Sequence, residues 1–590
     1  MSSIYLLVGA FAAFLLAYQF YARKIAGNLE LDDKFPTPAH TLEDNVDYVP
    51  TKVPVLLGHH FSSIAGAAPI IGPIVAAGYG WGPVFIWIVL GSIFLGAVHD
   101  LTAMVASVRH SGRSIGEVIE VYLGRTGKIL FLVFCWSTLI LVIAVFMQLV
   151  ASTFVENPAT ASSSGLYMIL ALIFGICVFR LKISYVGLTL VFLPLLFLSI
   201  WAGILFPLAP DASGITVPFL SLTLSPNSFW IIILLIYIFI ASVTPVWLLL
   251  QPRDYLSSFL LYALIIGGLT GVFFAKPELD LEMFRGFRPG NMEPMIPMLF
   301  VIVACGAISG FHSLVASGTS AKQLNRETDA VPVAYGGMLI EGLLAVLALI
   351  TAARFTFQEY SISVHQPISL FSKGIASFMT SIYIPFTNIK LPLSANACTT
   401  FAMLAVSAFA LTTLDTATRL SRFCLQELFT PRGTRNGVRR KSVLDRYTAT
   451  FVCVVVSGIL GLSGQWRMIW PLFGAANQLL AALTLLTVSV WIFHIRRNVW
   501  YTLVPTCLMF GVTLSALALM FFKNAGSALA LLNKQTLTAL EDDRLLADGI
   551  LSIITLLLFF LALILLVLSV KTFLRMGRER GRGTGNPVWQ

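Results

Sequence analysis

The chain has 590 residues, of which 57% are hydrophobic and only 11% are charged, and its net charge is +10. A soluble domain is about 25% charged, so this composition excludes an ordinary soluble protein and indicates one whose apolar faces are solvated by lipid. The Lys and Arg residues lie between apolar runs, which argues against nucleic-acid binding. The seven cysteines contain no Cys-x-x-Cys pair, and neither a metal nor a cofactor is expected.

Apolar runs that could cross a bilayer recur along the whole chain. A spanning helix needs about 20 predominantly apolar residues, and fifteen segments approach this length. They lie near 3–22, 53–77, 83–107, 128–151, 166–180, 186–207, 228–250, 255–275, 295–317, 332–353, 400–422, 447–463, 468–493, 500–522 and 550–572. The sequence therefore predicts an all-α integral membrane protein with about 15 transmembrane helices.

The distribution of basic residues predicts the orientation. No basic residue precedes the first run, and Arg23 and Lys24 follow it, which favours a retained helix with its N-terminus outside over a signal peptide. When the spans alternate in direction, 28 of the 38 Lys and Arg residues fall inside. The strongest inside group is Arg432, Arg435, Arg439, Arg440 and Lys441. We therefore expect the C-terminus inside.

One long outer loop, 354–399, contains an apolar stretch at 371–386 that is interrupted by Lys373. This stretch is shorter than a spanning helix. Its composition is compatible with a re-entrant helix and with an interfacial helix, and both interpretations remain open.

The second span contains a cluster of glycine, proline and polar residues at 58–73. Pro69 removes a backbone donor, and Gly66 and Gly72 permit backbone angles that other residues avoid. Unwound backbone is tolerated at membrane depth only inside protein or beside a water-filled cavity. We interpret the cluster as a discontinuous helix; the alternative is a kinked helix with a packing face of small residues.

Similar clusters occur at 241–247 in the seventh span and at 305–320 in the ninth. The second and seventh spans run in opposite directions and lie five spans apart. This pattern is typical of a five-plus-five inverted repeat of the LeuT type whose first helices are discontinuous. The expected division of the chain is 1–52, 53–207 for the first repeat, 228–422 for the second, and 423–590.

Broken half-helices favour a carrier. Free N–H groups at their N-termini attract a carboxylate and free C=O groups at their C-termini attract a cation. The sequence contains no nucleophile elbow, P-loop or His-Glu-x-x-His motif, which argues against an enzyme. We expect a secondary transporter with its site near the midplane between the second, seventh and ninth spans. An ion channel and a membrane sensor are the weaker alternatives.

Four segments of the chain resemble motifs of the carbon starvation protein A family, and the resemblance extends from about residue 50 to 490. These segments are 58–61, 245–255, 306–313 and 414–419. The resemblance implies a carrier in the bacterial inner membrane that takes up peptides or pyruvate by proton symport. Of these two substrates we expect pyruvate rather than short peptides. A Na⁺-coupled amino-acid or peptide symporter is the alternative. Lipids surround the carrier, and the sequence leaves homo-oligomer formation open.

The residues expected to contact substrate lie at the three clusters. They are Ser62, Ser63, Gly66, Thr244, Trp247, Gln251, Ser309 and Ser313. Hydroxyl and backbone groups at a break can bind a carboxylate or a cation. The alternative for the serines is that their hydroxyls bond back to the preceding helical turn.

Ionisable residues within spans are costly and usually functional. The candidates for proton or ion coupling are His59, His60, Asp100 and His312. Histidine titrates near neutral pH and can carry a proton. The alternatives are structural histidines and a salt bridge at Asp100.

Asp415 and Arg419 are four positions apart and share a helix face, so we expect a structural or gating ion pair. The alternative is that Arg419 binds a substrate carboxylate through two parallel hydrogen bonds. Arg253 with Asp254, and Glu341, are weaker candidates of the same kind.

Overall fold

The computed structural model describes most of the chain. The described residues are 2–44, 47–211, 215–217, 222–245, 247–290, 292–383, 390–430, 434–435, 438–439, 442–463, 466–534 and 539–581. The strands among them form two antiparallel pairs, β1 (Ile215–Val217) with β2 (Leu222–Leu224) and β3 (Thr434–Arg435) with β4 (Val438–Arg439). Helices make up most of the rest.

The α-helices of the described residues follow one another in this order. They are α1 (Ile4–Leu16), α2 (Arg23–Leu29), α3 (Pro38–Thr41), α4 (Val53–Ile64), α5 (Ala68–Ala76), α6 (Trp81–Gly91), α7 (Ala97–Arg109), α8 (Ile115–Glu156), α9 (Pro158–Phe179), α10 (Tyr185–Leu205), α11 (Pro226–Val243) and α12 (Leu250–Ala275). They continue with α13 (Met295–Ile302), α14 (Gly310–Gly318), α15 (Gly337–Ala353), α16 (Phe357–Ser363), α17 (Pro367–Met379), α18 (Ala395–Leu428), α19 (Arg446–Leu462), α20 (Trp466–His494), α21 (Trp500–Leu532) and α22 (Ala539–Gly581).

The predicted all-α membrane fold is confirmed. Within the described residues, 12 helices are long and apolar enough to cross a membrane, and the bent pair α4–α5 would make 13. Two further predicted spans, 295–317 and 447–463, coincide with the pair α13–α14 and with the 17-residue helix α19. The exact number of 15 crossings stays a prediction.

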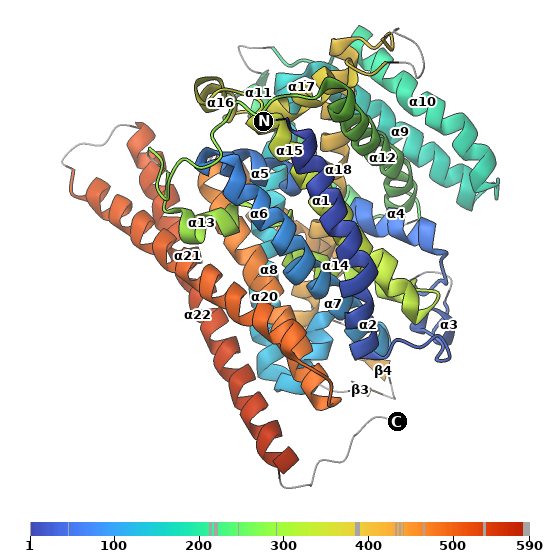
Figure 1. Ribbon diagram of the computed structural model, residues 1–590, viewed down its shortest axis with the longest axis vertical. Coiled ribbons are helices and arrows are strands. Elements are labelled where there is room, and N and C mark those ends of the chain that lie inside the picture. The colour runs from blue at the N-terminus through green and yellow to red at the C-terminus, as the bar shows by residue number, and fades with distance from the viewer. Residues whose placement is uncertain are drawn as a thin grey trace.

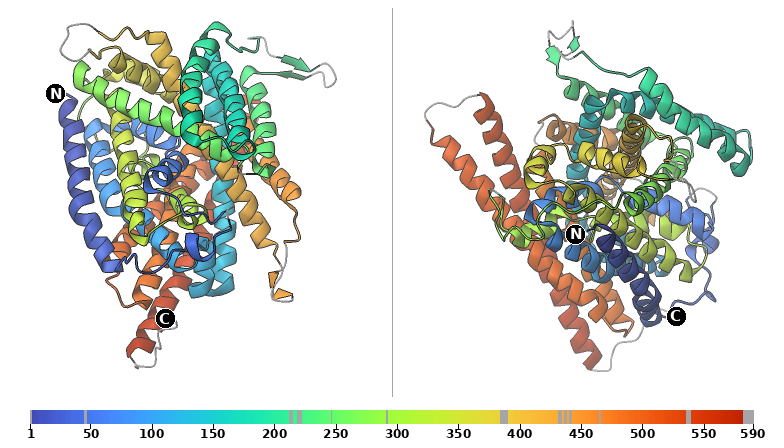
Figure 2. Two further views of the ribbon diagram at one scale, coloured as in Figure 1. Left: turned by 90° about the vertical axis from the view of Figure 1, so that its right-hand side faces the viewer. Right: turned by 45° about the horizontal axis from the view of Figure 1, so that its top comes forward.

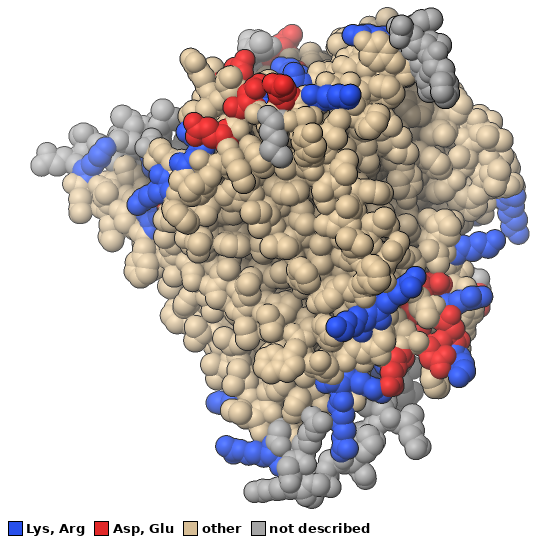
Figure 3. Space-filling view, in the orientation of Figure 1, with Lys and Arg blue, Asp and Glu red and all other residues tan. Residues whose placement is uncertain are grey.

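The arrangement of charges fits a membrane-spanning body. In the view of Figure 3 the coloured Lys, Arg, Asp and Glu side chains gather along the upper margin and along the right and lower margins, and a broad tan area separates the two groups. Helix α1 begins at the upper end, and α22 ends at the lower end (Figure 1). We refer to these two ends as the upper and lower ends below.

Long central helices form the interior. The most apolar stretches of α20 and α18 are 94% and 89% buried, whereas that of the first span, which runs from Ile4 to Leu29, is only 22% buried. Helix α8 packs along α18 and α20. The hairpin of α21 and α22 leans away on one side, and α9 with α10 lies on another (Figures 1 and 2). The peripheral helices therefore present apolar faces to lipid, while α8, α18 and α20 hold the core.

The predicted interruption of the second span is present. Helix α4 ends at Ile64, α5 begins at Ala68, and their axes differ by 49°. The intervening Gly66 lies in close contact with its surroundings. A Cβ at this position would lie 2.6 Å from Thr413 Oγ1 and 2.9 Å from Phe146 Cε1, so a glycine lets the chain turn against α18 and α8.

The ninth predicted span is interrupted as well, because 303–309 separate α13 from α14. Helix α13 packs on α5 and α14 packs on α4, so the two interrupted segments run antiparallel to each other. The Trp87 indole donates to the carbonyl of Val303 at 3.0 Å, and the Ser92 hydroxyl donates to that of Gly306 at 3.0 Å. These bonds satisfy carbonyls that the interruption frees from the helix.

The expected break inside the seventh span is wrong. Helix α11 ends at Val243, and the residues around Pro245 connect it to the next helix, α12; Val246 lies outside the described residues. A proline disfavours helical backbone angles at the residue before it. Thr244, which precedes Pro245, is extended, with φ −75° and ψ 147°. The discontinuous helix that we expected at the start of the second repeat, near 228, is therefore absent from the described residues of this segment. The five-plus-five repeat itself stays a prediction.

The apolar stretch 371–386 overlaps α17, and residues 384–386 lie outside the described part of the chain. The 13 residues of α17 rise by about 20 Å, which is too short to cross a bilayer. Helix α17 packs on α12, α15 and α18 near the upper end (Figure 1). It is thus a short helix embedded in the protein.

Candidate functional site

A fully buried group of ionisable side chains lies beside the second break. Asp100 of α7 accepts from two histidines: its Oδ1 lies 2.7 Å from His99 Nδ1, and its Oδ2 lies 2.9 Å from His312 Nδ1 of α14. The other imidazole nitrogen of His312, Nε2, lies 3.2 Å from Oε2 of Glu341 on α15. The structure therefore joins the predicted Asp100 and His312 and adds Glu341.

His60 completes this group from the first interrupted segment. Its Nδ1 lies 2.8 Å from Ser320 Oγ, and the ring is close enough to Asp100 and His312 to interact with them electrostatically. All five side chains are fully buried. We call His60, His99, Asp100, His312 and Glu341 the histidine–carboxylate centre. It brings α4, α7, α14 and α15 together through charged and titratable groups, which are costly to bury without partners.

A small cavity lies between the two breaks. Its volume of about 10 Å³ is close to the room that one water molecule needs. It is lined by Ile64, Gly66, Ala68, Val142, Phe146, Cys305, Phe311, Thr413, Phe473 and Asn477. The lining thus comes from both interrupted segments and from the central helices α8, α18 and α20.

Asn477 of α20 holds the second break in place. Its Oδ1 accepts from the Phe311 backbone N–H at 2.9 Å, and its Nδ2 donates to Ser309 Oγ at 3.0 Å. On the same helix, the hydroxyl of Thr484 lies 3.0 Å from that of Ser313. Two serines predicted as substrate contacts are therefore bonded to α20.

Asn477 and Thr484 are not among the residues predicted from the sequence, because α20 carries no cluster of glycine and proline. Polar residues such as Asn477 and Gln478 in an otherwise apolar span were the available signal.

The two serines of the first break bond back to their own helix in this structure, which is the alternative to substrate contact. The hydroxyls of Ser62 and Ser63 donate to the carbonyl of His59, at 3.1 and 2.8 Å, within their own helix. Gly66 does line the cavity. The backbone of the first break therefore reaches the cavity, while these two hydroxyls are engaged with the preceding turn.

Polar contacts join segments that are far apart in the sequence at both ends of the molecule. At the lower end Arg109 Nε lies 2.7 Å from Glu327 Oε1, and its Nη2 donates to the carbonyl of Glu30 at 2.9 Å. At the upper end the Tyr360 hydroxyl donates to the carbonyl of Ile74 at 2.8 Å, which ties α16 to α5.

Known proteins similar to this chain are membrane carriers. The family model of the carbon starvation protein CstA matches residues 2–364 and 356–516. The peptide transporter CstA of Escherichia coli (strain K12) is 31% identical, over 87% of this chain and 80% of the relative, and that of Bacillus subtilis (strain 168) is 31% identical over 98% of each chain. This chain belongs to the CstA family.

The pyruvate/proton symporter BtsT of Escherichia coli (strain K12) is 30% identical, over 88% of this chain and 82% of the relative. This member of the CstA family is therefore a multi-pass membrane transporter and not an enzyme.

A second buried charge cluster of this CstA-family chain surrounds Arg253 on α12. The guanidinium pairs with Oδ2 of Asp415 on α18 through Nη1, and its Nη2 lies 2.9 Å from Asp254 Oδ1. The hydroxyl of Tyr237 accepts from Arg253 Nη1 at 2.7 Å and donates to Asp415 Oδ2 at 2.7 Å. We call Tyr237, Arg253, Asp254 and Asp415 the arginine cluster. His59 Nδ1 lies 3.9 Å from Asp254 Oδ2, so the adjacent histidines His59 and His60 face different clusters.

The expected ion pair between Asp415 and Arg419 is wrong. Asp415 pairs with Arg253 from another helix, while Arg419 Nη2 donates to the carbonyls of Ala241 at 2.8 Å and Thr244 at 2.7 Å. The latter carbonyls lie at the C-terminus of α11, where backbone acceptors are left without a helical partner and a cation is favoured. Arg419 therefore caps the C-terminus of α11.

The predicted contacts Thr244, Trp247 and Gln251 do not line the cavity. The hydroxyl of Thr244 donates to the carbonyl of Ile240 at 2.6 Å. The guanidinium of Arg180 lies over the ring of Trp247, with 5.5 Å between Arg180 Cζ and the ring centre. These residues belong to the connection between α11 and α12 and to its flanks. The structure thus separates them from the residues at the two breaks.

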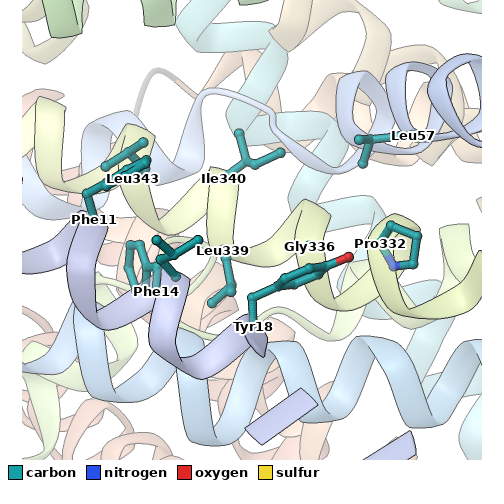
Figure 4. A pocket seen from close by; sticks show the side chains of 10 residues that line it. Phe11, Phe14, Tyr18, Leu57, Pro332, Gly336, Leu339, Ile340 and Leu343 are labelled. Atoms are coloured by element: carbon teal, nitrogen blue, oxygen red, sulfur yellow. The ribbon is translucent and has the colours of Figure 1, made fainter. Parts of the chain in front are cut away.

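A larger hollow lies between α1 and α15 and has a volume of about 280 Å³. Phe11, Phe14 and Tyr18 line it from the first span, and Leu57 lines it from α4 (Figure 4). No charged residue is among the residues that line it. Its apolar lining suits hydrocarbon and offers nothing to a carboxylate, so the small cavity between the breaks is the better candidate site.

Proposed function

We propose that this transporter imports a small carboxylate nutrient across the bacterial inner membrane by proton symport. The observation that carries the proposal is the meeting of two antiparallel interrupted segments at a small cavity beside the histidine–carboxylate centre. Such breaks are the usual site of substrate and ion binding in carriers. The relatives support it, because they are named peptide transporters and a pyruvate/proton symporter.

Helix N-termini at the cavity support a carboxylate as the bound group. Helix α5 begins at Ala68 and α14 begins at Gly310, and Ala68 and Phe311 line the cavity. The first turn of a helix offers backbone N–H groups and a partial positive charge, both of which favour an anion. Gly66 and the backbone around Ser309 would then border the substrate, while His60, Asp100 and His312 would serve the coupling ion.

The size of the cavity favours pyruvate over peptides. A volume of about 10 Å³ must expand for any substrate, and a two-carbon chain with a carboxylate demands less expansion than a dipeptide or tripeptide. We also propose that the upper end faces the periplasm and the lower end the cytoplasm, because Arg435, Arg439 and the basic end of α22 follow the positive-inside rule.

The two substrate classes differ in the charge that they move. A pyruvate anion with one proton is electroneutral, so only the pH gradient drives it, at about 1.4 kcal/mol per pH unit. A zwitterionic peptide with one proton carries net charge, and one charge that crosses 100 mV gains about 2.3 kcal/mol. Acidification without current therefore indicates pyruvate, and substrate-evoked current indicates a peptide.

The test is uptake by proteoliposomes of labelled pyruvate and of a panel of labelled dipeptides and tripeptides, with and without a proton uncoupler. We expect saturable pyruvate uptake and counterflow, with accumulation abolished by the uncoupler and unaffected when Na⁺ is replaced by K⁺. Uptake that requires Na⁺ would contradict proton coupling. Failure of every carboxylate and peptide to show counterflow would contradict the proposed function, because a pore shows no counterflow.

A further inference from the structure

The hydrogen bonds of His312 fix where its protons lie. A carboxylate oxygen is an acceptor, so the 2.9 Å contact between Asp100 Oδ2 and His312 Nδ1 places a proton on Nδ1. The remaining nitrogen, Nε2, faces Glu341 Oε2 at 3.2 Å. If neither of these two atoms held a proton, two electron-rich atoms would face each other. One proton between Nε2 and Oε2 turns this contact into an attraction, whichever atom holds it.

The surroundings of Glu341 make that proton necessary. Among the described residues, none donates a well-aligned hydrogen bond to either carboxylate oxygen of Glu341, and the side chain is fully buried. The titratable groups that face it are His312 from α14, Asp100 from α7 and Cys305 from the second break, with His60 and His99 behind them.

Without the shared proton, this fully buried group would hold two anionic carboxylates, Asp100 and Glu341. None of the ion pairs between described residues joins a Lys or Arg to either of them. Like charges that share a buried site disfavour joint ionisation, so one of the two carboxylates must take up a proton or return to water.

Glu341 also lies one helical turn from residues that contact each of the two interrupted segments. One turn before it, a Cβ at Gly337 would lie 3.5 Å from His60 Cδ2 of α4. One turn after it, Ala345 Cβ lies 2.8 Å from the position of a Cβ on Gly306, in the second break. A change of charge at Glu341 therefore acts on both interrupted segments that border the cavity.

We propose that Glu341 binds the transported proton and shares it with His312 Nε2, and that the carrier closes around its cavity only while this proton is bound. The assignment rests on the proposed proton symport and names the group that performs it. Release then requires an opening that brings water to Glu341. The step is a simple transfer: the proton leaves Oε2 or Nε2 for water, and no bond between heavy atoms changes.

The decisive variant is Glu341→Gln, which keeps the shape and imitates a carboxyl group that never loses its proton. We expect it to retain counterflow of labelled substrate, to lose substrate-driven proton entry as read by a pH dye inside the vesicles, and to lose accumulation driven by a pH gradient. The matched control is Glu282→Gln, because Glu282 is exposed and its carboxylate lies 3.6 Å from Arg285 Nε in a surface ion pair. It should resemble wild type in all three assays.

An infrared readout separates this proposal from the proposed function. In purified wild type without substrate, a pH titration should show the carbonyl band of a protonated carboxyl group, and Glu341→Gln should remove it whichever substrate is transported. If wild type transports no carboxylate or peptide, the proposed function fails while the infrared result still stands.

If Glu341→Gln does not fold, the conservative Glu341→Asp is used. It should keep proton-coupled accumulation and shift the pH at which the band titrates. Proton-coupled accumulation that survives in Glu341→Gln, or a carboxyl band that is unchanged in either variant, would overturn the assignment of the proton to Glu341.

Discussion

Each of the two buried charge clusters contains two carboxylates, but the groups that face those carboxylates differ. In the arginine cluster, one guanidinium lies between the carboxylates of Asp415 and Asp254. In the histidine–carboxylate centre, the partners of the two carboxylates, Asp100 and Glu341, among the described residues are imidazole rings. Arg stays charged at any physiological pH, whereas histidine can gain or lose a proton near neutral pH.

This difference separates a structural role from a functional one. In the arginine cluster the guanidinium keeps its charge and joins α12 to α18. The histidine–carboxylate centre has two charge states, with and without the proton shared by His312 and Glu341. Only the state with this proton is compatible with burial. Both clusters reach α4, since His59 lies near Asp254 and His60 near Asp100. The first half of the interrupted segment thus connects the fixed cluster with the changeable centre.

The largest effect is expected from removing the cation of the arginine cluster. Arg253→Met leaves the carboxylates of Asp415 and Asp254 buried without their partner, and breaking a buried ion pair in this way costs about 3–5 kcal/mol. The variant should be found in membranes in much smaller amounts and should unfold at a lower temperature in detergent. Wild-type stability with lost transport would instead mean that Arg253 binds substrate.

The same substitution in each cluster sharpens the comparison. Asp415→Asn removes a charged hydrogen bond to Arg253, so it should lower stability by about 1.5–3 kcal/mol and reduce transport only in proportion to folded protein. Asp100→Asn should leave more folded protein but lower the rate of coupled uptake at least about tenfold, the equivalent of 1.4 kcal/mol. Uptake normalised to folded protein is the measurement, and equal behaviour of the two variants would contradict distinct roles.

How far the sequence predicts these features depends on whether they are local. The interruptions at 58–73 and 305–313 follow from glycine, proline and polar residues that act on their own segment. Asp100 and His312 stand out because ionisable groups are rare within apolar runs. The break expected near Pro245 fails because a proline can also end a helix. Arg419 and Arg422, about 175 to 180 positions away, donate to backbone carbonyls at the end of α11, Arg422 to that of Ser242 at 2.7 Å.

Contacts between helices are what the sequence does not reveal. The spacing of Asp415 and Arg419 shows that they share a face, but not that Arg253 approaches this face from α12. Glu341 appears in sequence as a single buried acid, and its significance arises from the 3.2 Å contact with His312. Asn477 likewise becomes important only when α20 packs against the second break.

Moving the helix that carries His312 tests whether the centre needs its geometry. At Gly310 a Cβ would meet backbone atoms of Asn477 and Ala481, which cannot rotate away. Gly310→Ala should therefore shift α14, cost about 1–3 kcal/mol of stability and reduce the number of protons carried per substrate. The control is Gly511→Ala on α21, where a Cβ has no neighbour within 4 Å among the described residues. Unchanged coupling in Gly310→Ala would show that the position of His312 is not critical.

The smallest effect is expected at the first break, where the hydroxyl of Ser63 donates to the carbonyl of His59 at 2.8 Å. Because this bond stays within α4, Ser63→Ala should cost about 1 kcal/mol at most and change the KM for substrate less than about fivefold. Ser257→Ala is the matched control, since the Ser257 hydroxyl bonds to the Asp254 carbonyl at 3.0 Å in its own helix, away from the cavity. A KM that rises more than tenfold in Ser63→Ala alone, with stability unchanged, would mean that this hydroxyl leaves His59 and binds the substrate when the carrier opens.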